Sequence, residues 1–475
     1  MNTKDKLEFY GGPWVSFLPI MIFVVVAIYV ATSMASATIE GMWVGAIIGL
    51  LVSFIVAKDK AIFGKTVLKG MRAETAIAPV ACWIFAGIFA TVLRDSGLVD
   101  GILWAAYHTG TSGTTFIIIT FFASALFATA AGTGFGTITA GMGMLYPAGV
   151  LLGADPLVLA GAIVGGGAFG DNLAPISDTT ISAATSQNTD IGGVVKHRVR
   201  YIVPAAIMTV VTMLVLATSS DAVSTPVPQE RIAEMMDPRG LWMLIPAIAT
   251  IYTAIKKGDI VFATIIGILL GSVVSVVTGL NTVDNIISVE NGLLLRGVSG
   301  WMADLCILVV LLSAGIQMML DGGGSQRLLE TFKNIKSARA YEFISGMLAL
   351  ILSALMSINA PAILAVGLSF AKPMGEKFGV HPHRRANVIG NLACTLVYSL
   401  PWSAALLLAA SLSQQAAASF EGVPGLSPLE LTPYVLYAWF LLLVMMFAII
   451  TGWGCEYTDK VTDSDKAEDE IVLER

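Results

Sequence analysis

Residues 165–184 read GGGAFGDNLAPISDTTISAA and follow the apolar run PLVLAGAIV. The stretch places Asp171 and Asp178 on either side of Pro175, in a segment that is otherwise apolar and rich in small residues. Proline lacks a backbone N–H and clashes with the preceding turn, so it interrupts a helix. A carboxylate at membrane depth costs about 2.5 kcal/mol or more and usually marks a functional site. The stretch therefore predicts a helix that is unwound from Asp171 to Ser177, with two acids beside the break.

The composition is that of a membrane protein. The chain has 475 residues, of which 56% are hydrophobic and 13% are charged, and its mean hydropathy is +0.80. Soluble domains carry about 25% charged residues, and apolar runs of about 20 residues cross a bilayer as helices. We therefore expect an all-α polytopic protein whose partner is the lipid bilayer and not nucleic acid. The expected apolar spans are 14–33, 42–57, 74–93, 114–131, 137–152, 157–186, 201–218, 241–254, 258–279, 301–320, 341–356, 361–376, 385–415 and 434–453.

Basic residues decide the expected topology, because short cytoplasmic loops carry an excess of lysine and arginine. The basic groups can all face the cytoplasm only if the chain forms two re-entrant hairpins. The first hairpin consists of 114–131 and 137–152, and the second of 341–356 and 361–376. The chain then has about ten transmembrane crossings, both termini in the cytoplasm and an extracytoplasmic loop at 219–240. We expect it in a bacterial inner membrane. The basic groups are Lys58, Lys60, Lys65, Lys69 and Arg72; Lys196, Arg198 and Arg200; Lys256 and Lys257; Arg327, Lys333, Lys336 and Arg339; and Lys372, Lys377, Arg384 and Arg385.

The chain contains an internal repeat. Residues 141–184 align without gaps with 367–410 at an offset of 226 positions, and the eleven identical residues include three pairs of prolines. We infer two units, 14–218 and 241–453, followed by an acidic cytoplasmic tail at 454–475. The charge pattern starts the first unit inside and the second outside, so the repeat is inverted. Inverted repeats with broken helices are typical of secondary transporters, whose sites lie near the midplane of the bilayer.

The first break is a candidate cation site. Unwound carbonyl groups, hydroxyls and a carboxylate supply the hard oxygen atoms that coordinate Na⁺ in such transporters. Asp178 begins the second half-helix, where the helix dipole favours a negative charge, and is the expected principal ligand of Na⁺. Asp171 is the second candidate and could carry the proton. The alternative is that Ser177 or Asp178 only caps the helix. The candidate set is Asp178, Asp171, Thr179, Ser177, Asn172, Thr133 and Thr137.

The second repeat supplies equivalent candidates. The hairpin tips read AGTGFGT at 131–137 and SINAP at 357–361, and glycine in a tip allows a close approach of the backbone. A tight turn packed between helices is the alternative for each tip. The second break is expected at 397–401, around Pro401. The candidates are Ser357, Asn359, Ser399 and Ser403 for the cation, and Asn391, Tyr398 and Trp402 for an organic solute, with simple packing as the alternative for the two aromatic residues.

No motif indicates an enzyme or a bound cofactor. The four cysteines lack paired spacing, and the four histidines form no metal-ligand motif. The chain also lacks the HExxH, GxSxG and P-loop patterns of metalloproteases, hydrolases and nucleotide-binding enzymes. We expect no catalytic activity and no cofactor, with Na⁺ and H⁺ as coupling ions.

The segment GDNLAPISDTT resembles the signature of the NhaC-type Na⁺/H⁺ antiporter family, G-D-x-x-[SA]-P-[LI]-S-D-T-T on a broken helix. The resemblance implies Na⁺ and H⁺ as substrates, although the family also includes malate/lactate exchangers and amino-acid carriers. The repeat plan is similar to the wider ion transporter superfamily, which implies a scaffold domain, a mobile domain with two hairpins, an elevator-like motion and a homodimer. The matching positions are Gly170, Asp171, Pro175, Ser177, Asp178, Thr179 and Thr180.

Two functions remain open from the sequence. The first is Na⁺/H⁺ antiport by alternating access at a single carboxylate, because burial favours the neutral form of a carboxyl group and bound Na⁺ favours the charged form. The second is Na⁺- or H⁺-coupled transport of a small organic solute, such as an amino acid or a hydroxy acid like malate or lactate. A channel or an intramembrane enzyme is disfavoured, because inverted repeats with two hairpins fit alternating access better than an open pore.

Overall fold

The computed structural model describes residues 7–33, 39–111, 113–175, 177–219, 237–257, 260–299, 301–332, 335–357 and 359–457. Those residues are almost entirely helical, and their β-structure is limited to two isolated bridges. The helices of the first half are α1 (Leu18–Ser33), α2 (Ile39–Val56), α3 (Lys60–Met71), α4 (Glu74–Leu93), α5 (Val99–Thr109), α6 (Gly113–Ala131), α7 (Gly134–Leu151), α8 (Pro156–Leu173), α9 (Asp178–Ser186) and α10 (Ile191–Ser219).

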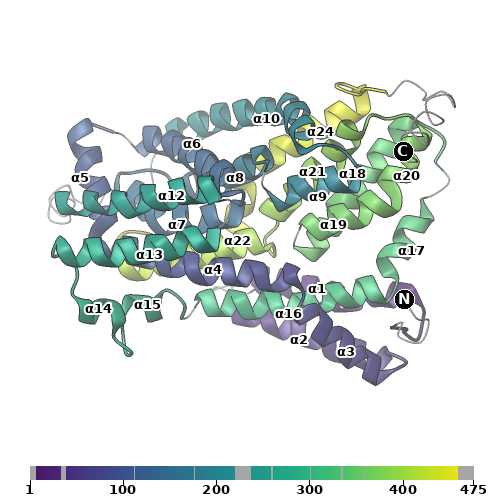
Figure 1. The fold of residues 1–475 in the computed structure, drawn as a ribbon, viewed down its shortest axis with the longest axis horizontal. Coiled ribbons are helices and arrows are strands. Elements are labelled where there is room, and N and C mark those ends of the chain that lie inside the picture. The colour runs from purple at the N-terminus through teal and green to yellow at the C-terminus, as the bar shows by residue number, and fades with distance from the viewer. Residues whose placement is uncertain are drawn as a thin grey trace, which may run out of the picture.

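The second half is also mostly helical. Its helices are α12 (Leu244–Lys257), α13 (Ile260–Val277), α14 (Val283–Ile287), α15 (Leu293–Arg296), α16 (Trp301–Asp321), α17 (Gly324–Thr331), α18 (Ala338–Met356), α19 (Asn359–Val366), α20 (Lys372–Lys377), α21 (Pro382–Ser399), α22 (Ala404–Ser419), α23 (Pro428–Leu431) and α24 (Leu436–Thr451). The longer helices run roughly along the long axis of the molecule (Figure 1). Helices α3, α17 and α20 lie at one end of that axis, and α14 and α15 lie at the other.

The apolar helices confirm a multi-pass membrane protein. Seven helical segments of the described residues are long and apolar enough to cross a membrane, and a bent pair formed by 428–434 and 436–451 makes an eighth. Three further apolar helices are shorter, at Gly41–Val56, Gly113–Thr129 and Val261–Val277. The expected ten crossings therefore stay a prediction. Helix α18 passes as a full span by length and composition, so the re-entrant character of the hairpins also stays a prediction.

The first helix break is present, and it is shorter than the sequence suggested. Helix α8 ends at Leu173, because Ala174 adopts an extended conformation before Pro175. Helix α9 begins at Asp178, where the Ser177 side chain accepts a hydrogen bond from the Thr179 N–H. Asp171 and Asn172 thus lie in the last turn of α8 and not in an unwound stretch. The prediction that unwinding starts at Asp171 was wrong, because the proline disrupts only the residues next to it.

The second break repeats these local features at the same offset of 226 residues. Leu400 is extended before Pro401, Ser403 caps the next helix, and α22 begins one residue later. The unwound residues are therefore 400–403 and not the expected 397–401. The start of the preceding helix also matches, since Asp155 and His381 each cap a helix that begins with proline. The repeat seen in the sequence is thus a repeat of helix boundaries.

Each hairpin brings two helices together at a short tip. Helices α6 and α7 contact each other along α8, and α18 and α19 contact each other along α21. The first tip turns at Gly132, which has a φ of 68°, and the second turns at Ser357, which has a φ of 54°. A positive φ is easy for glycine and uncommon for serine. The turns at Gly132 and Ser357 fit the alternative given for the tips, a tight turn, and do not test whether the tips contribute to a cation site.

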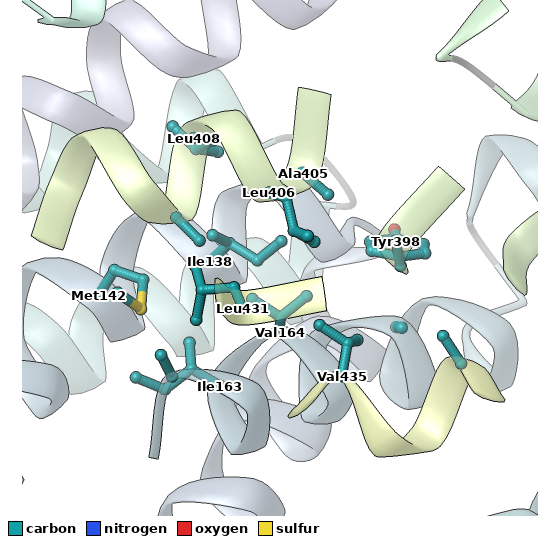
Figure 2. Close-up of a cluster of buried hydrophobic side chains, with 14 of the residues drawn as sticks. Ile138, Met142, Ile163, Val164, Tyr398, Ala405, Leu406, Leu408, Leu431 and Val435 are labelled. Atoms are coloured by element: carbon teal, nitrogen blue, oxygen red, sulfur yellow. The ribbon is translucent and has the colours of Figure 1, made fainter. Parts of the chain in front are cut away.

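The two largest hydrophobic clusters hold most of the helices together. The larger one surrounds α7, α8, α22 and α24, where Ile163, Val164, Leu406 and Val435 interdigitate (Figure 2). The smaller one surrounds the second hairpin and includes Ala183 of α9 with residues of α18, α19 and α21. Because α9 belongs to one cluster and α8 to the other, the first break lies at the junction of the two.

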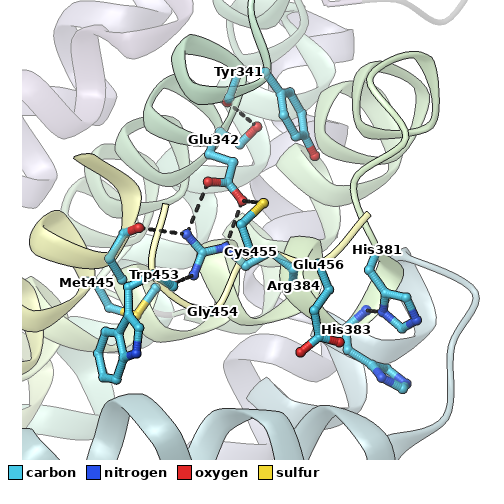
Figure 3. Close-up of polar contacts among 12 residues, drawn as sticks. Tyr341, Glu342, His381, His383, Arg384, Met445, Trp453, Gly454, Cys455 and Glu456 are labelled. Atoms are coloured by element: carbon cyan, nitrogen blue, oxygen red, sulfur yellow. Dashed lines mark hydrogen bonds and ion pairs between the residues drawn. The ribbon is translucent and has the colours of Figure 1, made fainter. Parts of the chain in front are cut away.

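Some arginines that were expected in cytoplasmic loops are buried inside helices instead. Arg384 lies in α21 and forms two hydrogen bonds of 2.7 and 3.0 Å with the carboxylate of Glu342 in α18 (Figure 3). It also donates to the Tyr201 hydroxyl and to the carbonyl oxygens of Trp453 and Ala448. The ion pair is almost completely buried, with side-chain exposures of 1% and 2%. Arg384 therefore links helices, and its charge does not indicate which side of the membrane this segment faces.

Three histidines gather near the start of α21. The rings of His381 and His383 are 4.8 Å apart, and His197 of α10 is 4.9 Å from His383. His383 Nε2 lies 2.8 Å from a carboxylate oxygen of Asp190. Hydrogen bonds from the Gly193 N–H and from His383 lower the pKa of the Asp190 carboxyl group. Within the described ranges, no group of three His, Cys, Asp or Glu residues is arranged to hold a metal ion.

Candidate functional site

The centre of the candidate site is the carboxylate of Asp171. Its side chain lies in the last turn of α8 and is only 3% exposed. One carboxylate oxygen accepts a hydrogen bond of 2.7 Å from the Ser177 hydroxyl. The other accepts a hydrogen bond of 3.0 Å from the Tyr398 hydroxyl. Both repeats therefore contribute to one carboxylate, since Tyr398 lies at the end of α21.

Ser177 and Thr179 extend this network across the break. The Ser177 hydroxyl lies 2.8 Å from the Thr179 hydroxyl as well as bonding to Asp171. A serine hydroxyl has one hydrogen, and Ser177 donates it to the carboxylate. The Thr179 hydroxyl must consequently donate to Ser177. The result is a row of oxygen atoms that runs from the first turn of α9 to the buried end of α8.

Asp178 occupies a different environment from Asp171. It is the first residue of α9, where its carboxylate faces the backbone amides of the first turn. Its side chain is exposed, whereas Asp171, Ser177 and Thr179 are buried. The two acids are thus one buried and one accessible carboxylate on either side of Ser177. The sequence assigned the principal role to Asp178, and the geometry gives the enclosed position to Asp171.

Arg198 is the feature that sequence reasoning missed. It is fully buried in α10, although the sequence grouped it with cytoplasmic basic residues. Its guanidinium donates hydrogen bonds to the Asn172 carbonyl, to the Thr180 hydroxyl and to the Asn387 side chain, at 2.8 to 2.9 Å. One nitrogen, Nη2, has no partner among the described residues. Arg198 therefore bridges both sides of the break and α21.

Both hairpin tips reach the break. Gly134 begins α7 against the Tyr398 hydroxyl, and a Cβ atom there would overlap the phenol oxygen. At the other tip, the Asn359 side chain donates to the Cys394 sulfur at 3.3 Å. The Thr179 hydroxyl also interacts with that thiol. Each tip is thus one side chain away from the Asp171 network.

The remaining candidates of the first repeat do not bind Asp171 directly. Asn172 donates to the Tyr437 hydroxyl at 3.3 Å, and its side-chain oxygen has no partner among the described residues. Thr137 donates to the Thr133 carbonyl and lines an apolar cavity of about 260 Å³ between α7 and α12. The Thr133 side chain makes no capping hydrogen bond.

Most candidates of the second repeat have structural partners. The Ser399 hydroxyl bonds to the Thr395 carbonyl within its own helix, and Ser403 caps α22. Trp402 donates to the Ala354 carbonyl at 3.4 Å, in the first helix of the second hairpin. The other partners are the Trp402 carbonyl for Ser357 and the Met445 sulfur for Asn391. Of the three solute candidates, only Tyr398 contacts the carboxylate network.

The sequence comparisons point to one family. The Na⁺/H⁺ antiporter family model matches residues 11–218. The chain is 28% identical over 199 residues to the Na⁺/H⁺ antiporter NhaC of Alkalihalophilus pseudofirmus, a match that covers 41% of this chain and 42% of that protein. Residues 11–218 of the chain are thus similar to the Na⁺/H⁺ antiporter family. Asp171, Ser177, Thr179 and Arg198 lie inside the matched range, whereas Tyr398 and the other contributions of the second half lie outside it.

Two other similarities accompany the match to the antiporter family. The chain is 27% identical over 364 residues to the malate-2H⁺/Na⁺-lactate antiporter of Bacillus subtilis (strain 168), which covers 71% of this chain and 73% of that protein. The structure of Neisseria gonorrhoeae MtrF, described with a class of antimetabolite efflux pumps, matches with a TM-score of 0.43 and 14% identity, over 92% of this chain and 96% of that one. At this TM-score the structural likeness is partial.

Proposed function

We propose that this chain is a secondary transporter that exchanges Na⁺ for H⁺, with Asp171 as the carboxylate that holds either ion. The observation that carries the proposal is the enclosed Asp171 carboxylate, whose direct partners are the hydroxyls of Ser177 and Tyr398. An intramembrane acid with neutral partners leaves a negative charge for a small cation to neutralise. Its oxygen-rich surroundings suit Na⁺. The match of residues 11–218 to the Na⁺/H⁺ antiporter family model supports the same pair of ions.

The exchange follows from competition for one carboxylate. Burial disfavours a charged carboxylate, and a bound cation favours it. Na⁺ arriving at the network therefore displaces the proton, and a proton displaces Na⁺ in the opposite direction. We assign Asp178 to the accessible end of the row, where it attracts the incoming cation, with Ser177 and Thr179 between it and Asp171. No cofactor takes part in this scheme.

The architecture that we propose for this cycle is alternating access by an elevator-like motion. The two units, 14–218 and 241–453, are placed as inverted repeats with about ten crossings and two re-entrant hairpins. The matching helix boundaries at an offset of 226 residues support two copies of one unit. We further propose a homodimer in a bacterial inner membrane, with both termini in the cytoplasm. The linker 219–240 and the tail from residue 458 lie largely or wholly outside the described residues.

Proteoliposomes test the site directly. With the purified chain reconstituted in vesicles free of organic solutes, an outward-directed proton gradient, with the vesicle interior more acidic than the bath, should drive uptake of radioactive sodium in the wild type. Asp171→Asn should abolish this flux, and Asp178→Asn should weaken it. Asp155→Asn is the matched control, because Asp155 caps α8 outside the network and asparagine is an equally good cap. Normal flux in Asp171→Asn would refute the assignment of Asp171.

A second function has its own support. The malate-2H⁺/Na⁺-lactate antiporter of Bacillus subtilis matches 71% of this chain. In addition, Arg198 provides a buried cation near the break, and one of its nitrogens has no partner among the described residues. A carboxylate is the natural partner of a guanidinium. Under this alternative, sodium uptake would require malate, lactate or another small carboxylate on one side of the vesicle. Sodium uptake in the absence of any solute favours simple Na⁺/H⁺ exchange.

A further inference from the structure

A basic groove lies on α3, well away from the Asp171 network. It has a volume of about 330 Å³. We call it the α3 groove, and it is lined by Ile62, Lys65, Thr66, Leu68, Lys69, Arg72 and Asp321. Apart from Asp321, which ends α16, these residues belong to α3 or directly follow it. The groove is therefore a feature of one short helix and its contact with a neighbouring span.

The charges in the α3 groove are not balanced. Three cations face one carboxylate, that of Asp321. Lys69 binds both oxygens of this carboxylate at 2.8 Å, and Gln317 donates to one of them at 2.8 Å. Asp321 is thus fully used by Lys69 and Gln317. Lys65 and Arg72 have no ion-pair partner among the described residues, so the lining has a surplus of two positive charges.

The position of α3 fixes which way these cations point. Helix α3 connects two apolar helices, α2 and α4, and its buried residues are Phe63, Thr66 and Gly70. Gly70 lies directly on the backbone of α16, where even a Cβ atom would clash with Ser313 and Ala314. Packing against α16 therefore holds one face of α3, and Lys65 and Lys69 lie on its exposed side.

The groove also has an apolar edge. Leu68 is 59% exposed although it lies between Lys65 and Arg72 in sequence and lines the same groove. Ile62, at the other end, is partly buried. A soluble anion would gain no binding energy from an exposed leucine beside its binding site. A phospholipid does, because its phosphate binds the cations and the beginning of its acyl chain covers the apolar side chain.

We propose that the α3 groove binds the headgroup of an anionic phospholipid, with Lys65 and Arg72 as the cations that recognise its phosphate. Basic pockets near the cytoplasmic ends of membrane helices are suited to such headgroups. Among the lining residues, Leu68 adds an apolar contact to the charge. This site is independent of the ion exchange proposed above, because it shares no residue with the Asp171 network.

Native mass spectrometry of the full-length chain in detergent tests the proposal. Phosphatidylglycerol and the zwitterionic phosphatidylcholine, with the same acyl chains, are added at equal concentration. The wild type should retain phosphatidylglycerol preferentially. Each cation near an anionic lipid contributes about fivefold to binding, so Lys65→Gln with Arg72→Gln should reduce the preference by about 25-fold. Lys65→Arg should retain it, since the charge is kept.

The matched control is the double variant Lys256→Gln with Lys257→Gln, which removes two exposed cations at the end of α12 outside the groove. It should bind phosphatidylglycerol like the wild type. Equal loss in this control, or unchanged binding in the Lys65 and Arg72 variant, would overturn the proposal. Full displacement of the lipid by free glycerol phosphate at equal concentration would also overturn it, because the ligand would then be a soluble anion.

Discussion

At the scale of single residues, the two acids of the signature have different surroundings. Asp171 is enclosed and accepts hydrogen bonds from Ser177 and Tyr398, whereas Asp178 is exposed at the start of α9. From the sequence, Asp178 was the expected principal ligand of Na⁺ and Asp171 the second candidate. The hydroxyls that surround Asp171 stabilise its charge without neutralising it, and under the proposed exchange Na⁺ or a proton binds there. The affinity for Na⁺ should therefore depend on individual hydroxyl groups.

Tyr398→Phe tests that dependence at the residue scale. The ring still packs against Phe135, whose centroid is 5.9 Å away, but the donor to Asp171 is lost. A hydrogen bond to a charged group is worth about 1.5–3 kcal/mol. We expect an apparent sodium affinity at least about tenfold weaker, with little change in maximal flux, measured as sodium uptake against concentration.

Tyr437→Phe is the matched control for Tyr398→Phe. Tyr437 is also buried, but its hydroxyl accepts from Asn172 and does not contact a carboxylate. Sodium affinity should therefore stay close to that of the wild type. If Tyr437→Phe and Tyr398→Phe weaken sodium affinity equally, the effect comes from general packing and the specific role of Tyr398 is wrong.

At the scale of elements, the break is held by contacts from three directions. Helix α21 contributes Tyr398, the first hairpin contributes Gly134, and α10 contributes Arg198. The helix ends themselves follow from proline and serine at each break. Their relative positions follow from these side-chain and backbone contacts. Changes in the contacting elements should consequently alter the site without changing any cation ligand.

Gly134→Ala is the sharpest change at the first hairpin. The new Cβ would occupy the space of the Tyr398 hydroxyl, so Tyr398 must leave Asp171 or the tip must withdraw. We expect sodium flux to fall by about tenfold or more, because the hydrogen bond to Asp171 is lost. Gly143→Ala in the same helix is the control, since its Cβ would meet only the Ala90 methyl at 3.1 Å. Normal flux in Gly134→Ala would show that the tip does not position Tyr398.

Arg198→Met should weaken the joint between α8, α9 and α21. The change leaves Asn172, Thr180 and Asn387 without their guanidinium partner in a buried site. Each unsatisfied buried group costs about 1–3 kcal/mol, so the melting temperature in detergent should fall clearly. Arg198→Lys keeps the charge but has fewer hydrogen-bond donors, so its melting temperature should lie between those of the wild type and Arg198→Met. A melting temperature equal to that of the wild type in Arg198→Met would contradict this account.

At the scale of the whole molecule, polar contacts join the C-terminal part to the helix core. Arg384 connects α21 to α18 through Glu342 and to the end of α24 through the Trp453 carbonyl (Figure 3). The bridge between Val380 and Tyr457 fixes the same region. The two largest hydrophobic clusters also hold the helices together. A change in the Arg384–Glu342 ion pair should therefore destabilise the fold while leaving the Asp171 network in place.

Glu342→Gln measures how much the Arg384–Glu342 ion pair contributes to the stability of the fold. Removing one partner of a buried pair leaves an uncompensated charge and costs about 3–5 kcal/mol. We expect a marked decrease in the midpoint of unfolding in detergent. The control is Glu8→Gln, which breaks the exposed pair with Lys58 and should change stability by less than about 1 kcal/mol. Equal effects of the two variants would mean that burial does not strengthen the Arg384 pair.

The sequence by itself determined the features that depend on nearby residues. The proline of each break, the serine that caps the next helix and the offset between the repeats were all readable, because a proline or a cap acts within a few residues of the chain. The apolar runs likewise predicted a multi-pass membrane protein, and the signature at 170–180 predicted the family. The extent of unwinding was overestimated, since it required knowing how far each helix continues.

Only the tertiary structure decided which acid is enclosed and what surrounds it. Tyr398 is 227 positions from Asp171, and Arg198 is 26 positions from Asn172. Such pairings depend on how α8, α10 and α21 pack, and no local pattern encodes them. Arg198 and Arg384 looked like loop charges because hydropathy cannot distinguish an exposed arginine from one whose hydrogen bonds are satisfied by buried partners. The physical reason is that burial is a property of the packed helices, whereas helix boundaries are a property of short stretches of chain.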